Sequence, residues 1–194
     1  MPLKTLVKVG NITNLSDARY CAGMGVEMLG FNVVEGTPRY INPTSFQEIR
    51  GWLSGPLVVA ELYSASAKTF GSVVENYRPD LFELSVHELD LITNTDTDVI
   101  LSIDKNSFNG QLLEQWKHRI RFLVVNQADY ENNFVDHVKN YFDILVAAND
   151  STNIAALTDD RNVKGITLLG GQEIRPGLRD FDALASVLDL LETD

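Results

Sequence analysis

Eight short apolar runs recur at fairly even spacing along the 194 residues, and this repetition restricts the possible fold more than any other feature of the sequence. Several runs, such as 57–60 and 122–125, are continuously apolar and rich in β-branched residues, as expected of parallel strands covered on both faces. The runs are Leu6 to Val9, Met28 to Val34, Leu57 to Leu62, Leu81 to Leu84, Val99 to Ile103, Arg121 to Val125, Asp143 to Ala147 and Gly165 to Leu169. The pattern predicts eight parallel strands.

The segments between these runs carry apolar residues at helical spacing. Two examples are the set Phe46, Ile49, Trp52 and Leu53 and the set Leu112, Leu113, Trp116 and Ile120. Strands that alternate with helices predict an α/β fold with a parallel sheet, either a closed (β/α)8 barrel or an open doubly wound sheet. No linker, low-complexity tract or evident repeat divides the chain, so we expect residues 1–194 to form a single domain.

Composition excludes several classes of partner. The content of 44% hydrophobic and 22% charged residues is ordinary for a soluble globular protein with a full core. The formal net charge of −11 repels polyanions, so a nucleic-acid partner is not expected. No run approaches the roughly 18 apolar residues of a membrane helix, so we expect a cytoplasmic protein without a membrane partner. A small anionic ligand remains compatible, because local N–H groups and one Arg can outweigh distant, screened charges.

Cysteine and histidine usage argues against a metal site or a cofactor. The single cysteine, Cys21, excludes intramolecular disulfides and cysteine-based metal clusters. It lies within a predicted helix, where a buried packing role is favoured over a reactive thiol. His87, His118 and His137 lie on different segments without the spacing of metal ligands.

The stretch from Lys8 to Thr13, Lys-Val-Gly-Asn-Ile-Thr, resembles the end of the first strand in phosphoribosylanthranilate isomerases. That family's signature reads Lys, a branched apolar residue, Cys, Gly, Ile, then Thr or Lys. Further stretches that resemble family motifs are Asn14 to Ala18, Gly23 to Phe31, Thr37 to Pro43 and Gly170 to Asp180. The resemblance covers nearly the whole chain and implies a (β/α)8 TIM barrel. Because such barrels typically need about 200 to 250 residues, its loops should be short.

The resemblance also implies the reference chemistry, an aldose–ketose isomerisation of tryptophan biosynthesis. An acid protonates the ribose ring oxygen, and a base removes the proton on C2. The family's base is a Cys at the position of Gly10, and its acid is an Asp at the position of Asn126. Neither residue here can transfer a proton usefully, so we expect the family's isomerase activity to be absent.

Two readings of these replacements stay open. In the structural reading, Gly10 permits a tight turn and Asn126 caps a helix or holds a loop. In the other, Asn11 and Asn126 hydrogen-bond a neutral part of a ligand in a repurposed pocket. A two-residue shift of the alignment would bring Asp129 nearer the acid position. Ser85 stands in place of a family His, and residues 128–134 replace a Gly-rich closing segment, which indicates an open site.

Several positions retain part of a ligand site by resemblance. Arg39 corresponds to the Arg that meets the substrate's carboxylate in the family, which a guanidinium can bind through two parallel hydrogen bonds. The alternative is that Arg39 pairs with a nearby carboxylate and orders its loop. Lys8 is expected to pair with carboxylates of the barrel. The phosphate-binding turns of the family correspond here to Ala147, Ala148, Gly170 and Gly171.

These two turns differ in what they allow. The pair Gly170 and Gly171 lets backbone N–H groups approach an anion closely, or it forms only a turn before the last helix. At Ala147 and Ala148, a Cβ atom on each residue could block that approach.

Acidic residues at or near the predicted strand ends are candidates for a substitute acid or base, and Asp104 is the preferred candidate among them. The alternative, which is the more common role of such rim charges, is that they are solvated or cap helices. The acidic residues are Glu35, Glu61, Glu83, Asp104 and Asp150. Three functions therefore stay open. The first is a non-catalytic protein that binds a small phosphorylated or carboxylated metabolite through Arg39, Asn11 and the Gly170 turn. The second is a sugar-phosphate isomerase with a substitute acid and base, and the third is a protein-interaction module. The sequence does not give the ligand or the oligomeric state.

Overall fold

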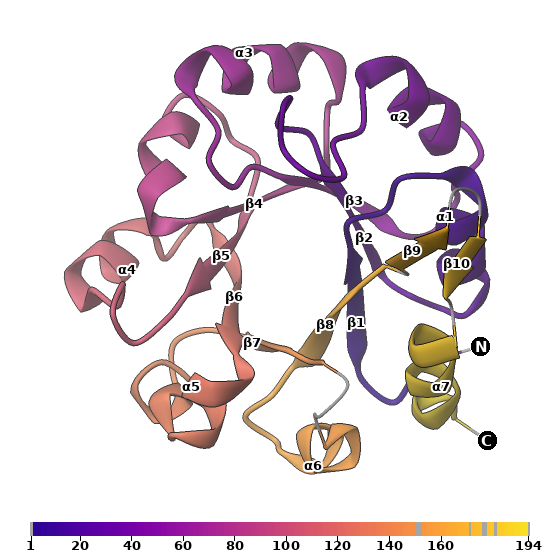
Figure 1. Ribbon diagram of the computed structural model, residues 1–194. Coiled ribbons are helices and arrows are strands. Elements are labelled where there is room, and N and C mark those ends of the chain that lie inside the picture. Colours follow the sequence, from indigo (N-terminus) through magenta and orange to yellow (C-terminus); the bar gives the residue numbers. More distant parts are fainter. Residues whose placement is uncertain (1, 150–152, 171, 176–177, 181, 194) are drawn as a thin grey trace.

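Eight parallel strands close into a barrel in the computed structural model, which describes residues 2–149, 153–170, 172–175, 178–180 and 182–193 (Figure 1). Neighbouring strands follow the order of the chain, and β8 pairs with β1 to close the ring. The strands are β1 (Leu6–Gly10), β2 (Met28–Asn32), β3 (Leu57–Glu61), β4 (Leu81–Ser85), β5 (Val99–Ile103), β6 (Ile120–Asn126), β7 (Ile144–Ala147) and β8 (Gly165–Leu169). The prediction of a (β/α)8 TIM barrel is confirmed, and the open sheet is excluded.

Short helices surround the barrel and cover its outer face (Figure 1). They are α1 (Leu15–Gly23), α2 (Pro43–Arg50), α3 (Ala67–Asn76), the 3-10 helix η1 (Val86–Ile92), α4 (Gly110–Trp116), α5 (Gln127–Glu131), the 3-10 helix η2 (Phe134–His137), α6 (Ile154–Asp159) and α7 (Asp182–Leu191). Asparagine side chains cap many of the helices, because an Asn oxygen accepts a backbone N–H that the first turn leaves unpaired. The capping residues are Asn14, Asn42, Asn109, Asn126 and Asn153.

Two helices end earlier than the apolar spacing predicts. Helix α2 ends at Arg50, where Gly51 follows as the C-cap, and Trp52 beyond it is 71% exposed. A glycine at this point favours termination, because it has a low helix propensity. Ile120 also lies outside its predicted helix, since it is the first residue of β6. The apolar pattern therefore identified both helices but overestimated their lengths.

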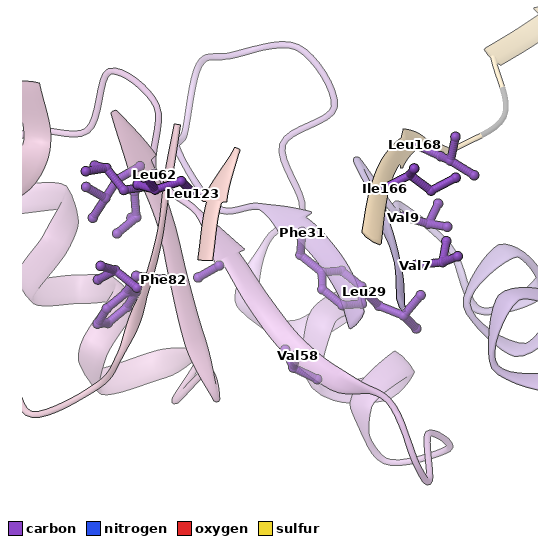
Figure 2. Close-up of a cluster of buried hydrophobic side chains, with 14 of the residues drawn as sticks. Val7, Val9, Leu29, Phe31, Val58, Leu62, Phe82, Leu123, Ile166 and Leu168 are labelled. Atoms are coloured by element: carbon purple, nitrogen blue, oxygen red, sulfur yellow. The ribbon is translucent and has the colours of Figure 1, made fainter. Parts of the chain in front are cut away.

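The core has two parts, as the alternation of side chains along each strand requires. The larger part lies between strands and helices, and Figure 2 shows members of it, among them Val7, Val9, Leu29, Phe31, Val58, Leu62, Phe82, Leu123, Ile166 and Leu168. The smaller part fills the barrel interior and consists of Met28, Val59, Leu81, Ile100, Phe122, Val124 and Leu145. Polar side chains continue the interior toward the carboxyl ends of β1, β3 and β4, the end at which barrels of this type place their sites.

Candidate active site at the carboxyl-end mouth

A buried lysine on β1 lies at the centre of the polar interior. Lys8 is 1% exposed, and its Nζ lies 2.7 Å from Oε1 of Glu61 and 2.6 Å from Oε2 of Glu83. This confirms the prediction that Lys8 pairs with barrel carboxylates. Burial alone would lower the pKa of Lys8, but the two carboxylates together raise it well above its usual value. The amine therefore stays protonated near neutral pH, which is unsuitable for a nucleophile.

The carboxylate of Glu61 explains why β1 ends in glycine. Its Oε1 accepts from Lys8 and its Oε2 accepts from the backbone N–H of Asn11 at 3.1 Å. A Cβ atom on Gly10 would lie 2.5 Å from Glu61 Oε1, and one on Gly30 would lie 2.2 Å from the same atom. The carboxylate thus occupies the space into which a side chain at position 10 would project. The tight-turn reading of Gly10 is wrong, because Gly10 is a strand residue whose backbone is not left-handed.

Tyr63, just beyond the end of β3, covers the second carboxylate. Its hydroxyl donates to Glu83 Oε1 at 2.6 Å, while the residue as a whole is 40% exposed. Burial raises the pKa of Glu83, although Lys8 opposes this effect. Burial and the Glu83 carboxylate also raise the pKa of Tyr63. We refer to Lys8, Glu61, Tyr63 and Glu83 as the mouth cluster. Sequence reasoning missed Tyr63, although its place two residues after Glu61 was a usable signal.

Asn126, at the family's acid position, caps helix α5. Its Oδ1 accepts from the backbone N–H of Asp129 at 2.9 Å, and its Nδ2 donates to Asp129 Oδ2 at 2.8 Å. Asp129 is buried, and its Oδ2 also accepts from the backbone N–H of Lys105 at 3.1 Å. The capping role predicted as one reading of Asn126 is therefore confirmed. Asn126 and Asp129, the two residues considered for the acid position, are hydrogen-bonded to each other. Both polar atoms of the Asn126 amide take part in these hydrogen bonds.

Three of the predicted ligand residues lie together beside the mouth cluster. Nη1 of Arg39, in the loop after β2, donates to the carbonyl of Gly170 at 3.1 Å. The N–H of Gly170, just after β8, donates to the carbonyl of Gly10 at 2.8 Å. Asn11 follows Gly10 and has a left-handed backbone, as Arg39 does. Within the described residues, Arg39 hydrogen-bonds the carbonyl of Gly170. The alternative prediction was that it pairs with a nearby carboxylate.

Two backbone N–H groups in the described part of the predicted phosphate turns, those of Ala148 and Gly170, are already hydrogen-bonded within the barrel. Ala148 donates to the carbonyl of Thr167 at 3.0 Å, and Gly170 donates to Gly10. The side chain of Ala147 packs against the interior core. Gly171 lies outside the described residues. The expected turn directly into the last helix is wrong, because the hairpin strands β9 (Gln172–Arg175) and β10 (Leu178–Asp180) lie between β8 and α7.

The other candidate residues lie in local structure. The carboxylate of Asp104, just after β5, accepts from the N–H groups of Asn106 at 2.8 Å and Ser107 at 2.7 Å. These hydrogen bonds lower the pKa of Asp104, which weakens it as a base. Ser85 donates to Glu88 at 2.6 Å in the capping box of η1. Glu35 is exposed, and Asp150 lies outside the described residues.

Cys21 is fully buried on α1, which confirms its packing role, and burial raises the pKa of its thiol to about 12. Within the described ranges, no group of three or more His, Cys, Asp and Glu side chains is placed to hold a metal ion. None of the helices in those ranges combines the length and the apolar character needed to cross a membrane.

Comparison with curated proteins gives a partial sequence match. No family model matches the chain. Two N-(5'-phosphoribosyl)anthranilate isomerases from Bradyrhizobium strains are 32% identical to it over 87 residues. The match covers 44% of this chain and 40% of each relative, so it spans less than half the length of these relatives.

Comparison with solved structures covers nearly the whole barrel. A phosphoribosylanthranilate isomerase in complex with reduced 1-(o-carboxyphenylamino)-1-deoxyribulose 5-phosphate has a TM-score of 0.73 at 19% identity and covers 95% of this chain and 97% of that one. The enzyme from Thermus thermophilus has a TM-score of 0.70 at 19% identity, with 96% and 100% covered. The enzyme from Thermotoga maritima has a TM-score of 0.73 at 18% identity, with 95% and 97% covered. These structures establish the shared fold, and together with the curated match they relate this chain to the phosphoribosylanthranilate isomerase family.

Proposed function

We propose that this protein is a barrel of the phosphoribosylanthranilate isomerase type that binds a small carboxylated or phosphorylated metabolite at its carboxyl-end mouth and does not complete the family's isomerisation. The observation that carries the proposal is the position of Glu61. Its carboxylate lies against Gly10 and fills the space of the side chain that serves as the base in the family. Position 10 therefore carries no side chain that could act as a base, and the Glu61 carboxylate occupies the space that such a side chain would need.

The missing acid supports the same conclusion. Opening the ribose ring requires a proton on the ring oxygen, and Asn126 at the acid position is an amide engaged with Asp129. A positioned acid or base each contributes about 10² to 10⁴ in rate, so losing the family's acid alone slows ring opening by a large factor. We expect turnover of phosphoribosylanthranilate at or near the uncatalysed rate.

Arg39 supports ligand binding at the mouth. A guanidinium carries five N–H donors, and the hydrogen bond of Arg39 to Gly170 uses Nη1 and leaves further donors for a ligand carboxylate. The N–H groups of Ala148 and Gly170 are used within the barrel, which favours a carboxylated ligand over one held by its phosphate alone. The ligand would lie over Gly10 and Asn11, beside the mouth cluster.

Two measurements test the proposal on the purified native chain. The first is turnover of phosphoribosylanthranilate, which should not exceed the background rate. The second is calorimetric titration with anthranilate, inorganic phosphate and the reduced aminoketose phosphate found in the related structure. We expect the reduced compound to bind, the Arg39→Ala variant to lose this binding, and the Arg19→Ala variant to retain it, because Arg19 is exposed on α1. Native turnover well above background, or no binding of any probe, would contradict the corresponding part of the proposal.

A further inference from the structure

We propose that Glu61 is a general base that removes a proton from the carbon next to the carbonyl group of an open-chain substrate bound at the mouth. This inference goes beyond the proposed function and rests on it for the binding of the substrate. The first observation behind it is positional. Oε1 of Glu61 lies 2.5 Å from the point where a Cβ on residue 10 would stand. A base carried by residue 10 would present its reacting atom in the same region.

The surroundings distinguish Glu61 from the other acids of the mouth. Glu83 accepts from the hydroxyl of Tyr63, and Asp104 accepts from two backbone N–H groups of its own turn. Both oxygens of Glu61 are also hydrogen-bonded, to Lys8 and to the N–H of Asn11, so its position is what differs. It borders Gly10, and Gly10 and Asn11 are the backbone closest to Gly170, whose carbonyl accepts from Arg39. A substrate held by the guanidinium of Arg39 would therefore lie beside the backbone that Glu61 contacts.

The charge of the mouth cluster favours proton uptake. Lys8 carries one positive charge and lies between two carboxylates, so the buried groups have an excess of one negative charge when both carboxylates are ionised. A proton received from a substrate carbon would remove this excess, which is favourable because uncompensated charge is costly in the interior. Burial raises the pKa of Glu83, and the neighbouring Glu61 carboxylate adds to this effect, which reflects the same excess of negative charge.

The missing acid restricts the substrate to an open chain. Without a proton donor at Asn126, a ring-closed sugar stays closed, but a free carbonyl group needs no ring opening. In the proposed step, the C–H bond breaks and its electron pair forms a C=C bond, while the carbonyl π electrons move to oxygen. The proton passes to Glu61, and its return to carbon restores the carbonyl compound. The step needs no oxidant, reductant or second reactant.

The test is hydrogen exchange in D2O. The probe is 1-(o-carboxyphenylamino)-1-deoxyribulose 5-phosphate, the unreduced form of the binding probe above, whose C1 hydrogens lie next to a ketone. Proton NMR follows the loss of the C1 signal. We expect the native chain to accelerate exchange, the Glu61→Gln variant to lose about 10²-fold or more of that rate, and the Glu48→Gln variant to exchange at the native rate. Glu48 is exposed on α2, so it serves as the matched control.

A second variant protects the test against loss of folding. Glu61→Asp keeps the negative charge beside Lys8 but withdraws the carboxylate by one methylene, so it should fold as the native chain does and exchange more slowly. Exchange that is no faster than in buffer while the probe binds overturns this inference and leaves the proposed function standing. Exchange that is unchanged in both Glu61 variants also overturns it. Failure of the probe to bind contradicts the proposed function itself.

Discussion

The two halves of the barrel mouth differ in kind. In the half built by β1 to β4, the interior beneath the mouth holds the charged side chains Lys8, Glu61 and Glu83, which contact one another. In the half built by β5 to β8, Val124 and Ala147 line the interior and belong to its apolar core. The buried charges of the interior described here therefore come from the first four strands.

The largest effect should follow from removing the charge that joins the first half. Lys8→Met leaves two buried carboxylates without their cation, and breaking such a buried pair costs about 3 to 5 kcal/mol. Urea denaturation measures the change in the free energy of unfolding. The matched control is Lys117→Met, because Lys117 pairs with Glu114 at 3.7 Å on the surface, where such a pair contributes about 0 to 1 kcal/mol. Equal effects of the two substitutions would show that the first half is not organised around Lys8.

A smaller effect should follow from Gly10→Cys. The new side chain collides with Glu61 Oε1, and overpacking of this kind costs about 1 to 3 kcal/mol. Combining it with Glu61→Ala should remove the collision, so a double-mutant cycle should give a coupling energy of about 0.5 to 3 kcal/mol. Additive single effects would mean that the two positions do not compete for space.

Substitutions in the second half should lower the stability of the fold without changing the chemistry at the mouth. Asn126→Ala removes the cap of α5 and should cost about 1 kcal/mol, as should Asn109→Ala at the start of α4. Neither change should alter hydrogen exchange of the aminoketose probe. A loss of exchange in the Asn126 variant, with exchange retained in the Asn109 variant, would assign chemistry to the second half as well.

The smallest effect concerns Cys21, which lies outside the mouth. Its thiol ionises near pH 9.0 when unfolded, and burial raises the folded pKa to about 12. The unfolded chain therefore binds fewer protons between these values, and stability that is complete below pH 9 falls as pH rises toward 12. At pH 9.5 the loss should be less than about 1 kcal/mol. Urea denaturation at pH 7 and 9.5, with Cys21→Ala as the control, measures it; equal losses in both chains would contradict it.

Cys21 also provides a reference for the mouth. A thiol reagent at pH 8 should label Cys21 only after unfolding. In the Gly10→Cys, Glu61→Ala chain, the thiol at position 10 should react in the folded protein. This difference would distinguish an accessible mouth from a closed one.

The sequence was sufficient for the parts of the molecule that depend on local pattern. Each of the eight apolar runs contributes a strand, because burial on both faces requires an apolar run. The cap at Asn126 could be anticipated, since Asn followed by Asp129 three residues later is typical of a helix start. The ion pairing of Lys8 was expected, because a lysine within a strand that is covered on both faces needs a partner.

The rest depends on contacts across the barrel. Glu61 lies beside Gly10 and Gly30 because β2 separates β1 from β3 in the ring, and no local spacing relates residues 10 and 61. For the same reason Asp104 was preferred over Glu61 as a substitute base. The turn from Asp104 to Ser107, in which the N–H of Ser107 donates to the Asp104 carboxylate, is local, but it was not anticipated. The hairpin of β9 and β10 was missed because the family resemblance pointed to a helix after β8.

The close packing of Glu61 against Gly10 and Gly30 has a consequence for any redesign of the site. A chain that carried both a cysteine at position 10 and a glutamate at position 61 would have to hold two side chains in one space. A barrel with a cysteine at position 10 and a barrel with a glutamate at position 61 are therefore interconverted by single substitutions most easily through a chain with a small residue at positions 10 and 61. Any attempt to place a side chain at position 10 therefore starts best with a smaller residue at position 61, because the carboxylate there holds the space.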